Sequence, residues 1–319
     1  MRRLGLARPN LSLKGVTAMS TFSSFSVMGL LCVSAALSPV LGAQSPPNFS
    51  PNAGVGWVSQ PGGLKPPASG AGPVRDDPAH PTISNNEFRL SGKQPTFPVA
   101  DLSNPILQPW VREALRKRNE LVLAGQPGYG PRQSCWPRGV PGFLLEGMFQ
   151  PMFIVQGPKE IVMTAQADNH QRRRIYLDVP HSANVKPSWF GESVGHYEGD
   201  ALVVDTIGMS TRTFIDDYQT PHTDKLHVTE RFHLIDGGKT MEVNLHVEDP
   251  GAFTMPWNAI QHYRRVEPGV AENTPVLEND ATSAVGAAGP LLEGTCVEGN
   301  NNYFGNDKIP VPQADKPDF

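Results

Sequence analysis

The sequence has few charged residues, only three cysteines and a single long apolar run, and each scarcity excludes a class of protein. Charged residues make up 18% of the 319 residues and the formal net charge is −4, so the chain has no basic stripe for general nucleic-acid binding. No second long apolar stretch follows the first, which excludes a protein with several membrane-spanning helices. Walker, GxGxxG and HExxH strings are also missing, which leaves nucleotide, dinucleotide and zinc-protease functions without support.

The apolar run, residues 27–41, follows a basic N-terminus and is followed by Gly42 and Ala43. This order of positive charge, apolar core and small residues is typical of a secretory signal peptide, so we expect residues 1–43 to be removed on export. The run is too short to cross a bilayer comfortably, which makes a lone membrane anchor the weaker alternative. We therefore expect a periplasmic or secreted protein with no membrane span after cleavage.

Cleavage leaves two cysteines, Cys135 and Cys296. An even pair in an exported chain most simply forms one disulfide, which here ties the C-terminal part of the chain to the start of the folded region. In the chain-entropy model, closing so long a loop stabilises the fold by about 4–5 kcal/mol. A reactive thiol is the alternative, but Cys135 precedes Trp136 and Pro137 and has no neighbouring base to ionise it.

Composition divides the chain into segments. Residues 44–102 are rich in proline and glycine and poor in apolar clusters, so we expect a flexible leader. Apolar residues then recur at helical spacing, which predicts a helix over residues 105–124 within a helical segment 103–130. Residues 131–300 are rich in β-forming residues and predict one barrel domain, and residues 301–319 are expected to form an irregular tail.

Short segments rich in valine, isoleucine, phenylalanine and tyrosine fill residues 152–266 and are separated by turn residues. Gly157, Gly199 and Gly237 lie in three of these turns, as tight hairpins require. Short strands with short connections predict a mainly β fold, an antiparallel meander that closes into a calycin- or lipocalin-like barrel because open edges aggregate. The expected strands are Met152–Gln156, Glu160–Ala165, Arg173–Val179, Gly191–Glu198, Ala201–Ile207, His227–Ile235, Thr240–Glu248 and Ile260–Val266.

Several strings in this region are distinctive together. They are NHQRRRIYLD at residues 169–178, WFGESVGHYEGDALVVDT at 189–206, TFIDDYQTPHTDKLHVTERF at 213–232, EDPGAFTMPW at 248–257 and CVEGN at 296–300. In this order they resemble a large family of exported bacterial proteins. The resemblance covers residues 135–300 and implies a single β-rich domain with a calycin-like barrel, without implying a particular activity.

Three carboxylates stand at strand positions that alternate with apolar residues. Glu230 and Asp205 lie on faces expected to be buried, and Asp249 continues such a face at the end of its strand. A buried carboxylate must be paired, hydrogen-bonded or protonated. One interpretation is structural, with each carboxylate bound by Arg174, Arg231 or backbone N–H groups. The other is an acid–base site at one mouth of the barrel, with Glu230 as its first candidate.

His196 and His222 lie in predicted turns or loops, where an imidazole suits proton transfer or metal binding. Taken singly, such a histidine is more often a hydrogen-bonded structural residue. The spacing from His222 to His227 matches no metal-binding motif, so no metal is expected. Ser193 stands in GESVG, the letters of a nucleophile elbow, but a strand and a hairpin are predicted around it instead of the strand–turn–helix that an elbow needs.

Aromatic residues flank these polar groups. Trp189, Tyr197 and Trp257 are candidates to line a pocket for a hydrophobic ligand, with core packing as the alternative. Arg231 or Arg174 is the candidate to hold an anionic group of that ligand.

Three functions are consistent with this sequence. The leading hypothesis is a cofactor-independent lyase, dehydratase or isomerase that acts on a hydrophobic small molecule, with Glu230, His196, His222 and Asp205 transferring protons. No cofactor, metal or nucleic-acid partner is expected. The second hypothesis is a non-catalytic, lipocalin-like binder of an apolar ligand. The third is a structural or assembly protein of the cell envelope, which predicts a filled barrel and a large exposed apolar surface.

Overall fold

The computed structural model describes residues 45–52, 54–60, 62–84, 87, 91–126, 135–145, 151–165 and 171–266. The predicted signal segment 1–43, Cys296 and the predicted tail 301–319 lie outside these residues, so export, the disulfide and the tail stay predictions. Within the described part, no helix is both long and apolar enough to cross a membrane.

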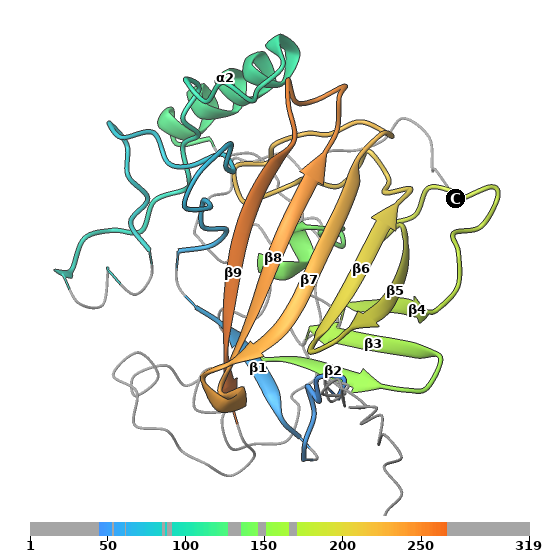
Figure 1. The fold of residues 1–319 in the computed structure, drawn as a ribbon. Coiled ribbons are helices and arrows are strands. Elements are labelled where there is room, and N and C mark those ends of the chain that lie inside the picture. The colour runs from blue at the N-terminus through green and yellow to red at the C-terminus, as the bar shows by residue number, and fades with distance from the viewer. Residues whose placement is uncertain are drawn as a thin grey trace, which may run out of the picture. The chain divides into compact units, whose positions relative to one another are not determined.

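The described residues form a closed barrel of nine strands, which confirms the mainly β fold predicted from the sequence (Figure 1). The strands neighbour one another in chain order, and the first pairs with the last to close the ring. All the strands expected from the sequence are present, with only their ends adjusted. The strands are β1 Gly56–Ser59, β2 Met152–Gln156, β3 Glu160–Ala165, β4 Arg172–Leu177, β5 Glu192–Glu198, β6 Ala201–Ile207, β7 His227–Ile235, β8 Thr240–Glu248 and β9 Trp257–Val266.

The sequence analysis expected antiparallel neighbours throughout, and one pair departs from this expectation. β4 and β5 run parallel, with Ile175 aligned to Ser193 and Leu177 to Gly195. Strand direction alternates around an antiparallel ring, so a closed ring with an odd number of strands must contain a parallel pair. A parallel pair needs a crossover instead of a hairpin, and the connection 178–191 supplies it.

β1 comes from the stretch that the sequence analysis assigned to a flexible leader, and for these residues that prediction is wrong. The strand pairs with β9, from Gly56 opposite Val266 to Ser59 opposite Tyr263. Trp57 is fully buried. A strand of four residues whose partner lies at the far end of the folded region leaves no hairpin signal in the local sequence.

Side chains alternate between the barrel interior and its outer face. Val204, Phe232 and Val243 are among the fully buried residues of the inner face. The short helix η1, Gly142–Leu145, packs against this interior, since the Tyr263 hydroxyl donates a hydrogen bond to the carbonyl oxygen of Leu144. Part of the interior is therefore filled by the protein's own chain.

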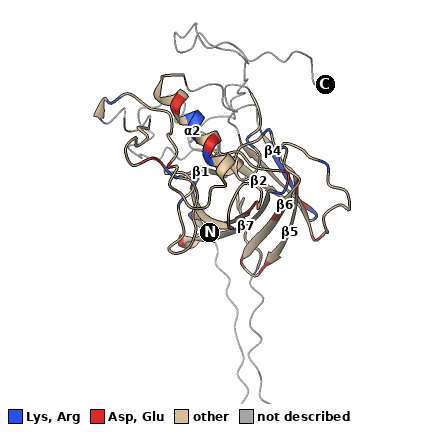
Figure 2. Ribbon diagram, turned by 90° about the horizontal axis from the view of Figure 1, so that it is seen from above, with Lys and Arg blue, Asp and Glu red and all other residues tan. Residues whose placement is uncertain are grey.

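The α-helix α2 spans Pro109–Leu123, so the predicted helix is present but begins later than expected. Pro109 stands in the first turn of the helix, where backbone N–H groups have no partner within the helix, so the N–H that proline lacks is not needed there. The Asn119 side chain binds the Ala100 backbone twice, accepting from its N–H at 2.9 Å and donating to its carbonyl at 2.8 Å. Acidic and basic residues such as Glu113 and Arg116 alternate on the exposed side of the helix (Figure 2).

Candidate functional site

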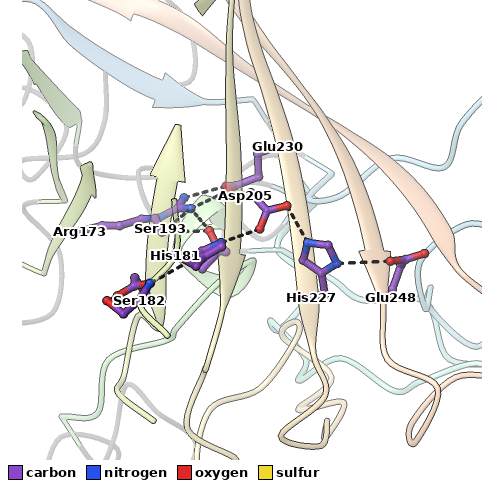
Figure 3. Close-up of polar contacts among 10 residues, drawn as sticks. Arg173, His181, Ser182, Ser193, Asp205, His227, Glu230 and Glu248 are labelled. Carbon is purple, nitrogen blue, oxygen red and sulfur yellow. Dashed lines mark hydrogen bonds and ion pairs between the residues drawn. The ribbon is translucent and has the colours of Figure 1, made fainter. Parts of the chain in front are cut away.

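Inside the barrel, Glu230 forms a fully buried ion pair with Arg173 (Figure 3). Arg173 Nη1 donates to Glu230 Oε1 at 2.7 Å, and Nη2 donates to Oε2. Nη2 also donates to Thr206 Oγ1 at 2.8 Å and, together with Nε, to Ser193 Oγ at 3.1 and 3.2 Å. These four side chains come from β4, β5, β6 and β7, and each is at most 2% exposed.

The predicted inward position of Glu230 is confirmed, but its partner is Arg173 and not Arg174 or Arg231. Burying two charges costs several kcal/mol per ion, and only bidentate geometry with satisfied neighbours offsets that cost. Both Glu230 oxygens are engaged here, which gives the residue a structural role and adds no support for its predicted role in proton transfer. Ser193 belongs to the same cluster on a β-strand, so it is not the nucleophile of an elbow.

The outer face of these strands carries a chain of carboxylates and imidazoles centred on Asp205 (Figure 3). Asp205 Oδ1 lies 2.8 Å from His181 Nε2, and Oδ2 lies 2.7 Å from His227 Nε2. The expectation that Asp205 faces the interior is wrong, since its side chain is 37% exposed. β6 carries apolar residues on both faces, and its unbroken pairing with β7 places Leu202, Val204 and Thr206 inside, so Asp205 faces outward.

Each of these histidines also reaches a second carboxylate. His181 Nδ1 lies 3.0 Å from Glu192 Oε1, and His227 Nδ1 lies 3.3 Å from Glu248 Oε2. Carboxylate oxygens only accept hydrogen bonds, so an imidazole between two carboxylates donates from both nitrogens only when it carries both protons. We use the name Asp205 chain for the five linked residues Glu192, His181, Asp205, His227 and Glu248.

The Asp205 chain is open to solvent, with side-chain exposure rising from 20% at Glu192 to 43% at Glu248. Burial raises the pKa of Asp205, but hydrogen bonds from His227 and His181 outweigh it and hold that pKa below its ordinary value. Hydrogen bonds from the Ser182 hydroxyl and backbone lower the pKa of Glu192. Both carboxylates are therefore ionised at neutral pH, as is needed to orient an imidazole and stabilise its charged form.

Glu242 repeats this pattern further along the sheet. Its Oε2 lies 2.7 Å from His262 Nε2, and its Oε1 lies 3.3 Å from His233 Nε2. Burial raises the pKa of Glu242, but hydrogen bonds from His262 and Asn244 outweigh it, so the pKa is lowered. These side chains are 22–23% exposed, against 36–37% for His227 and Asp205. The Asp205 chain is thus the more accessible of the two.

The arginines predicted to bind substrate lie on the outer surface in pairs of their own. Arg174 Nη2 and Nε donate to Glu160, and Arg231 Nη1 donates to Glu198 Oε2 at 2.6 Å. His196, predicted to transfer protons, lies 2.9 Å from the other oxygen of Glu198. All five side chains are at least 40% exposed. The structure therefore does not bring Arg174, Arg231 or His196 to the buried carboxylate.

His222 and Asp249 both hold loops at one end of the barrel. His222 is 4% exposed, with Nε2 2.8 Å from Thr213 Oγ1 and Nδ1 2.9 Å from the Thr223 carbonyl oxygen. Burial lowers the pKa of His222, which favours a neutral ring. Asp249 accepts hydrogen bonds from Thr223 N and Oγ1, both at 2.6 Å, and from Gly251 N at 3.0 Å. The structural interpretation accounts for both residues.

The three predicted pocket aromatics contact different neighbours. Trp257 is 1% exposed and packs edge-on against Phe253, with ring centroids 5.8 Å apart. Trp189 lies against the ring of Trp136, also at 5.8 Å. Tyr197 is partly buried against the barrel core. Core and surface packing explain these contacts without a shared pocket.

Sequence reasoning missed Arg173 as the partner of Glu230, and it missed all the members of the Asp205 chain except Asp205 itself: His181, His227, Glu192 and Glu248. Arg173, Ile175 and Leu177 are every second residue of β4 and therefore share one face of the strand. Because Ile175 and Leu177 are apolar, this spacing marks Arg173 as the inward-facing member of three consecutive arginines. His181 has no such local signal, because it lies in the irregular crossover 178–191 and meets Asp205 only in the folded barrel.

Among the described residues, no group of three or more His, Cys, Asp or Glu side chains is arranged to hold a metal ion. No protein-family model matches this sequence, and no curated protein matches it either. The Asp205 chain is therefore the candidate site on the strength of its own geometry.

Proposed function

We propose that this protein is an exported acid–base enzyme whose proton-transfer groups are His181, Asp205 and His227. One observation carries the proposal: the two oxygens of Asp205 each lie within hydrogen-bonding distance of a different, solvent-accessible imidazole. Asp205 orients both imidazoles through Nε2, and the Nδ1 of each ring faces a second carboxylate, so a substrate that exchanges a proton at Nδ1 takes the place of Glu192 or Glu248. Two such pairs sharing one carboxylate supply an acid and a base side by side.

The two histidines are suited to different roles. His181 is the less exposed and has the shorter second contact, 3.0 Å from Nδ1 to Glu192 Oε1, and we assign it the role of general acid. His227 is 36% exposed, and its Nδ1 lies 3.3 Å from Glu248. In its neutral form Nε2–H donates to Asp205 and Nδ1 takes up a proton, after which Glu248 stabilises the imidazolium.

The surroundings favour a polar substrate over the hydrophobic one expected from the sequence. Ser182, His246 and Asn258 border the Asp205 chain, and His246 Nδ1 contacts Asn258 Oδ1 at 2.8 Å. We propose a small hydroxylated carbonyl compound that is dehydrated or isomerised. In dehydration, His227 removes a proton from the carbon next to the carbonyl, His181 protonates the departing hydroxyl group, and water leaves as the carbon–carbon double bond forms.

The test is proton exchange at carbon in deuterated water. The mature protein is incubated with a panel of hydroxy acids, hydroxy ketones and sugar lactones, and nuclear magnetic resonance follows the loss of the C–H signal and the appearance of alkene. Asp205→Asn should reduce exchange by about two to four orders of magnitude, the range for a lost general acid–base group. Glu198→Gln, which alters a carboxylate–imidazole contact elsewhere on the outer surface, is the control. Wild-type exchange rates in Asp205→Asn contradict the proposal.

The export proposal has its own test. We propose that residues 1–43 are removed and that Cys135 and Cys296 form a disulfide in an oxidising compartment. Intact-mass measurement of protein recovered from the periplasm or medium should give a chain that starts at or near residue 44 and is two hydrogens lighter than its reduced form. A full-length or fully reduced chain contradicts this proposal.

A further inference from the structure

Residues 45–50 close one end of the barrel by inserting an aromatic ring into it. Phe49 is fully buried, and its ring packs edge-on against Phe232 of the inner face, with centroids 6.4 Å apart and planes at 76°. Trp57, also fully buried, donates from Nε1 to the Phe49 carbonyl oxygen at 2.9 Å. In the export proposal above, this segment begins the mature chain.

Side chains, and not strand pairing, hold this segment in place. Among the described residues, no backbone–backbone hydrogen bond involves residues 45–50. Gln156 at the end of β2 makes two contacts: its Oε1 accepts from Phe49 N at 2.7 Å, and its Nε2 donates to the Pro47 carbonyl oxygen at 2.8 Å. The same Nε2 lies 3.0 Å from the Tyr197 hydroxyl on β5. One amide thus fixes the segment to two strands.

Phe253 provides a direct comparison, because it is a second buried phenylalanine packed edge-on against an aromatic of the inner face. Its centroid lies 5.8 Å from that of Trp257, with planes at 89°. Its backbone is fixed, however: Phe253 N donates to the Asp249 carbonyl oxygen at 2.7 Å, and Leu107 forms an isolated β-bridge with Phe253. The two rings are similarly buried, but among the described residues only the Phe49 ring is carried by a segment without backbone–backbone hydrogen bonds.

We infer that residues 45–50 are a displaceable plug and that the site beneath Phe49 binds a small uncharged aromatic molecule in its place. A ring that packs edge-on against Phe232 beside Trp57 already defines the shape and chemistry that the site accepts. Release of the plug breaks the contacts with Gln156 and Trp57 and the hydrogen bond from Ser50 Oγ to the Ile154 carbonyl oxygen, but no strand pairing. This site lies on the inner face and is separate from the Asp205 chain, so it does not depend on the proposed enzyme activity.

Binding of the fluorescent hydrophobe phenylnaphthylamine to the mature, folded protein tests the inference. Gln156→Leu, which keeps side-chain volume but loses the polar contacts, should bind the probe at least about tenfold more tightly than wild type. Phe49→Ala should bind it more tightly still. Phe253→Ala is the matched control, because it also removes a buried phenylalanine ring but leaves a cavity covered by a fixed backbone. The affinity of this variant for the probe should stay at the wild-type level. In wild type, saturating probe should expose residues 45–50 to a protease.

Two results overturn the inference. One is equal affinity of wild type and Gln156→Leu, which would make the segment a permanent part of the core. The other is an equal gain in Phe253→Ala, which would show that any core cavity admits the probe. Gln156→Leu decides the matter if Phe49→Ala fails to fold.

Discussion

Arg173 binds both carboxylate oxygens of Glu230 inside the barrel, where neither side chain is exposed. The guanidinium thereby joins β4 to β7 and, through Ser193 and Thr206, to the two strands between them. β4 needs this connection because its parallel ladder with β5 is short. The buried pair holds the sheet whose outer face carries the Asp205 chain.

Glu230→Gln should destabilise the fold by about 3–5 kcal/mol, because it leaves the Arg173 charge buried and uncompensated. Urea unfolding measures the change. Glu160→Gln, which removes the exposed partner of Arg174, should cost less than about 1 kcal/mol. Equal losses in the two variants would contradict a special role for the buried pair. Replacing both partners, in Arg173→Met with Glu230→Leu, should recover most of the stability, since no unpaired charge remains.

Asp249→Asn should cost about 1.5–3 kcal/mol, the range for hydrogen bonds to a charged group. The amide keeps one acceptor oxygen and loses the other, although Thr223 and Gly251 both donate to this carboxylate. Thermal unfolding gives the comparison with Asp224→Asn, an exposed neighbour that should behave as wild type. A loss confined to Asp249→Asn supports its structural role, and a stable variant would contradict it.

Gly191 and Gly237 permit a test at the same backbone φ angle. Both have φ of +64°, but a Cβ on Gly191 would lie 2.4 Å from the Ile207 carbonyl oxygen, whereas one on Gly237 meets nothing within 4 Å. Gly237→Ala should cost about 1–2 kcal/mol from the left-handed conformation alone. Gly191→Ala should cost about 1–3 kcal/mol more because the backbone must also shift. Equal unfolding free energies of Gly191→Ala and Gly237→Ala would contradict this, because they would mean that the backbone near Ile207 moves away from the new Cβ without a loss of stability.

Asp216 should give the fold a pH dependence of its own. Burial raises its pKa from 3.8 to about 6, in spite of hydrogen bonds from Thr220 and Tyr218. Between these values the folded state binds more protons than the unfolded state, so this residue's contribution to stability falls as pH rises from about 4 to about 6. Asp216→Asn should remove that fall, as measured by urea unfolding across this range. A variant with the wild-type pH profile would contradict the raised pKa.

The sequence predicted the barrel well because its strands are joined by short turns, where alternation and glycine are local signals. It could not predict β1, whose partner β9 is distant along the chain, nor the parallel pair, which follows from the count of strands in the ring. The orientation of Glu230 was predicted because its neighbours alternate strictly. That of Asp205 was not, because β6 has apolar residues on both faces, Val203 and Ile207 on one and Leu202 and Val204 on the other.

The candidate site was harder to predict than the fold. Asp205 was the one proposed proton-transfer residue that belongs to the site, and its partners His181 and His227 lie on a crossover and on the next strand. Their meeting depends on strand register, which single-sequence patterns leave open. His196 and His222 were chosen for their places in turns, but each contacts a different local partner.

The parallel pair also affects how the barrel comes apart. Among the described residues, the backbone of β2–β4 pairs with its neighbours through one aligned pair, Trp57 with Met152, on one side and through the short β4–β5 ladder on the other, beside the side-chain contacts of Arg173. The longer ladders of β5–β9 keep the rest of the sheet together. Partial opening should therefore release β2–β4 as one unit, so the backbone amides of Ile161 and Met163 should exchange with solvent before those of Val243 and Leu245.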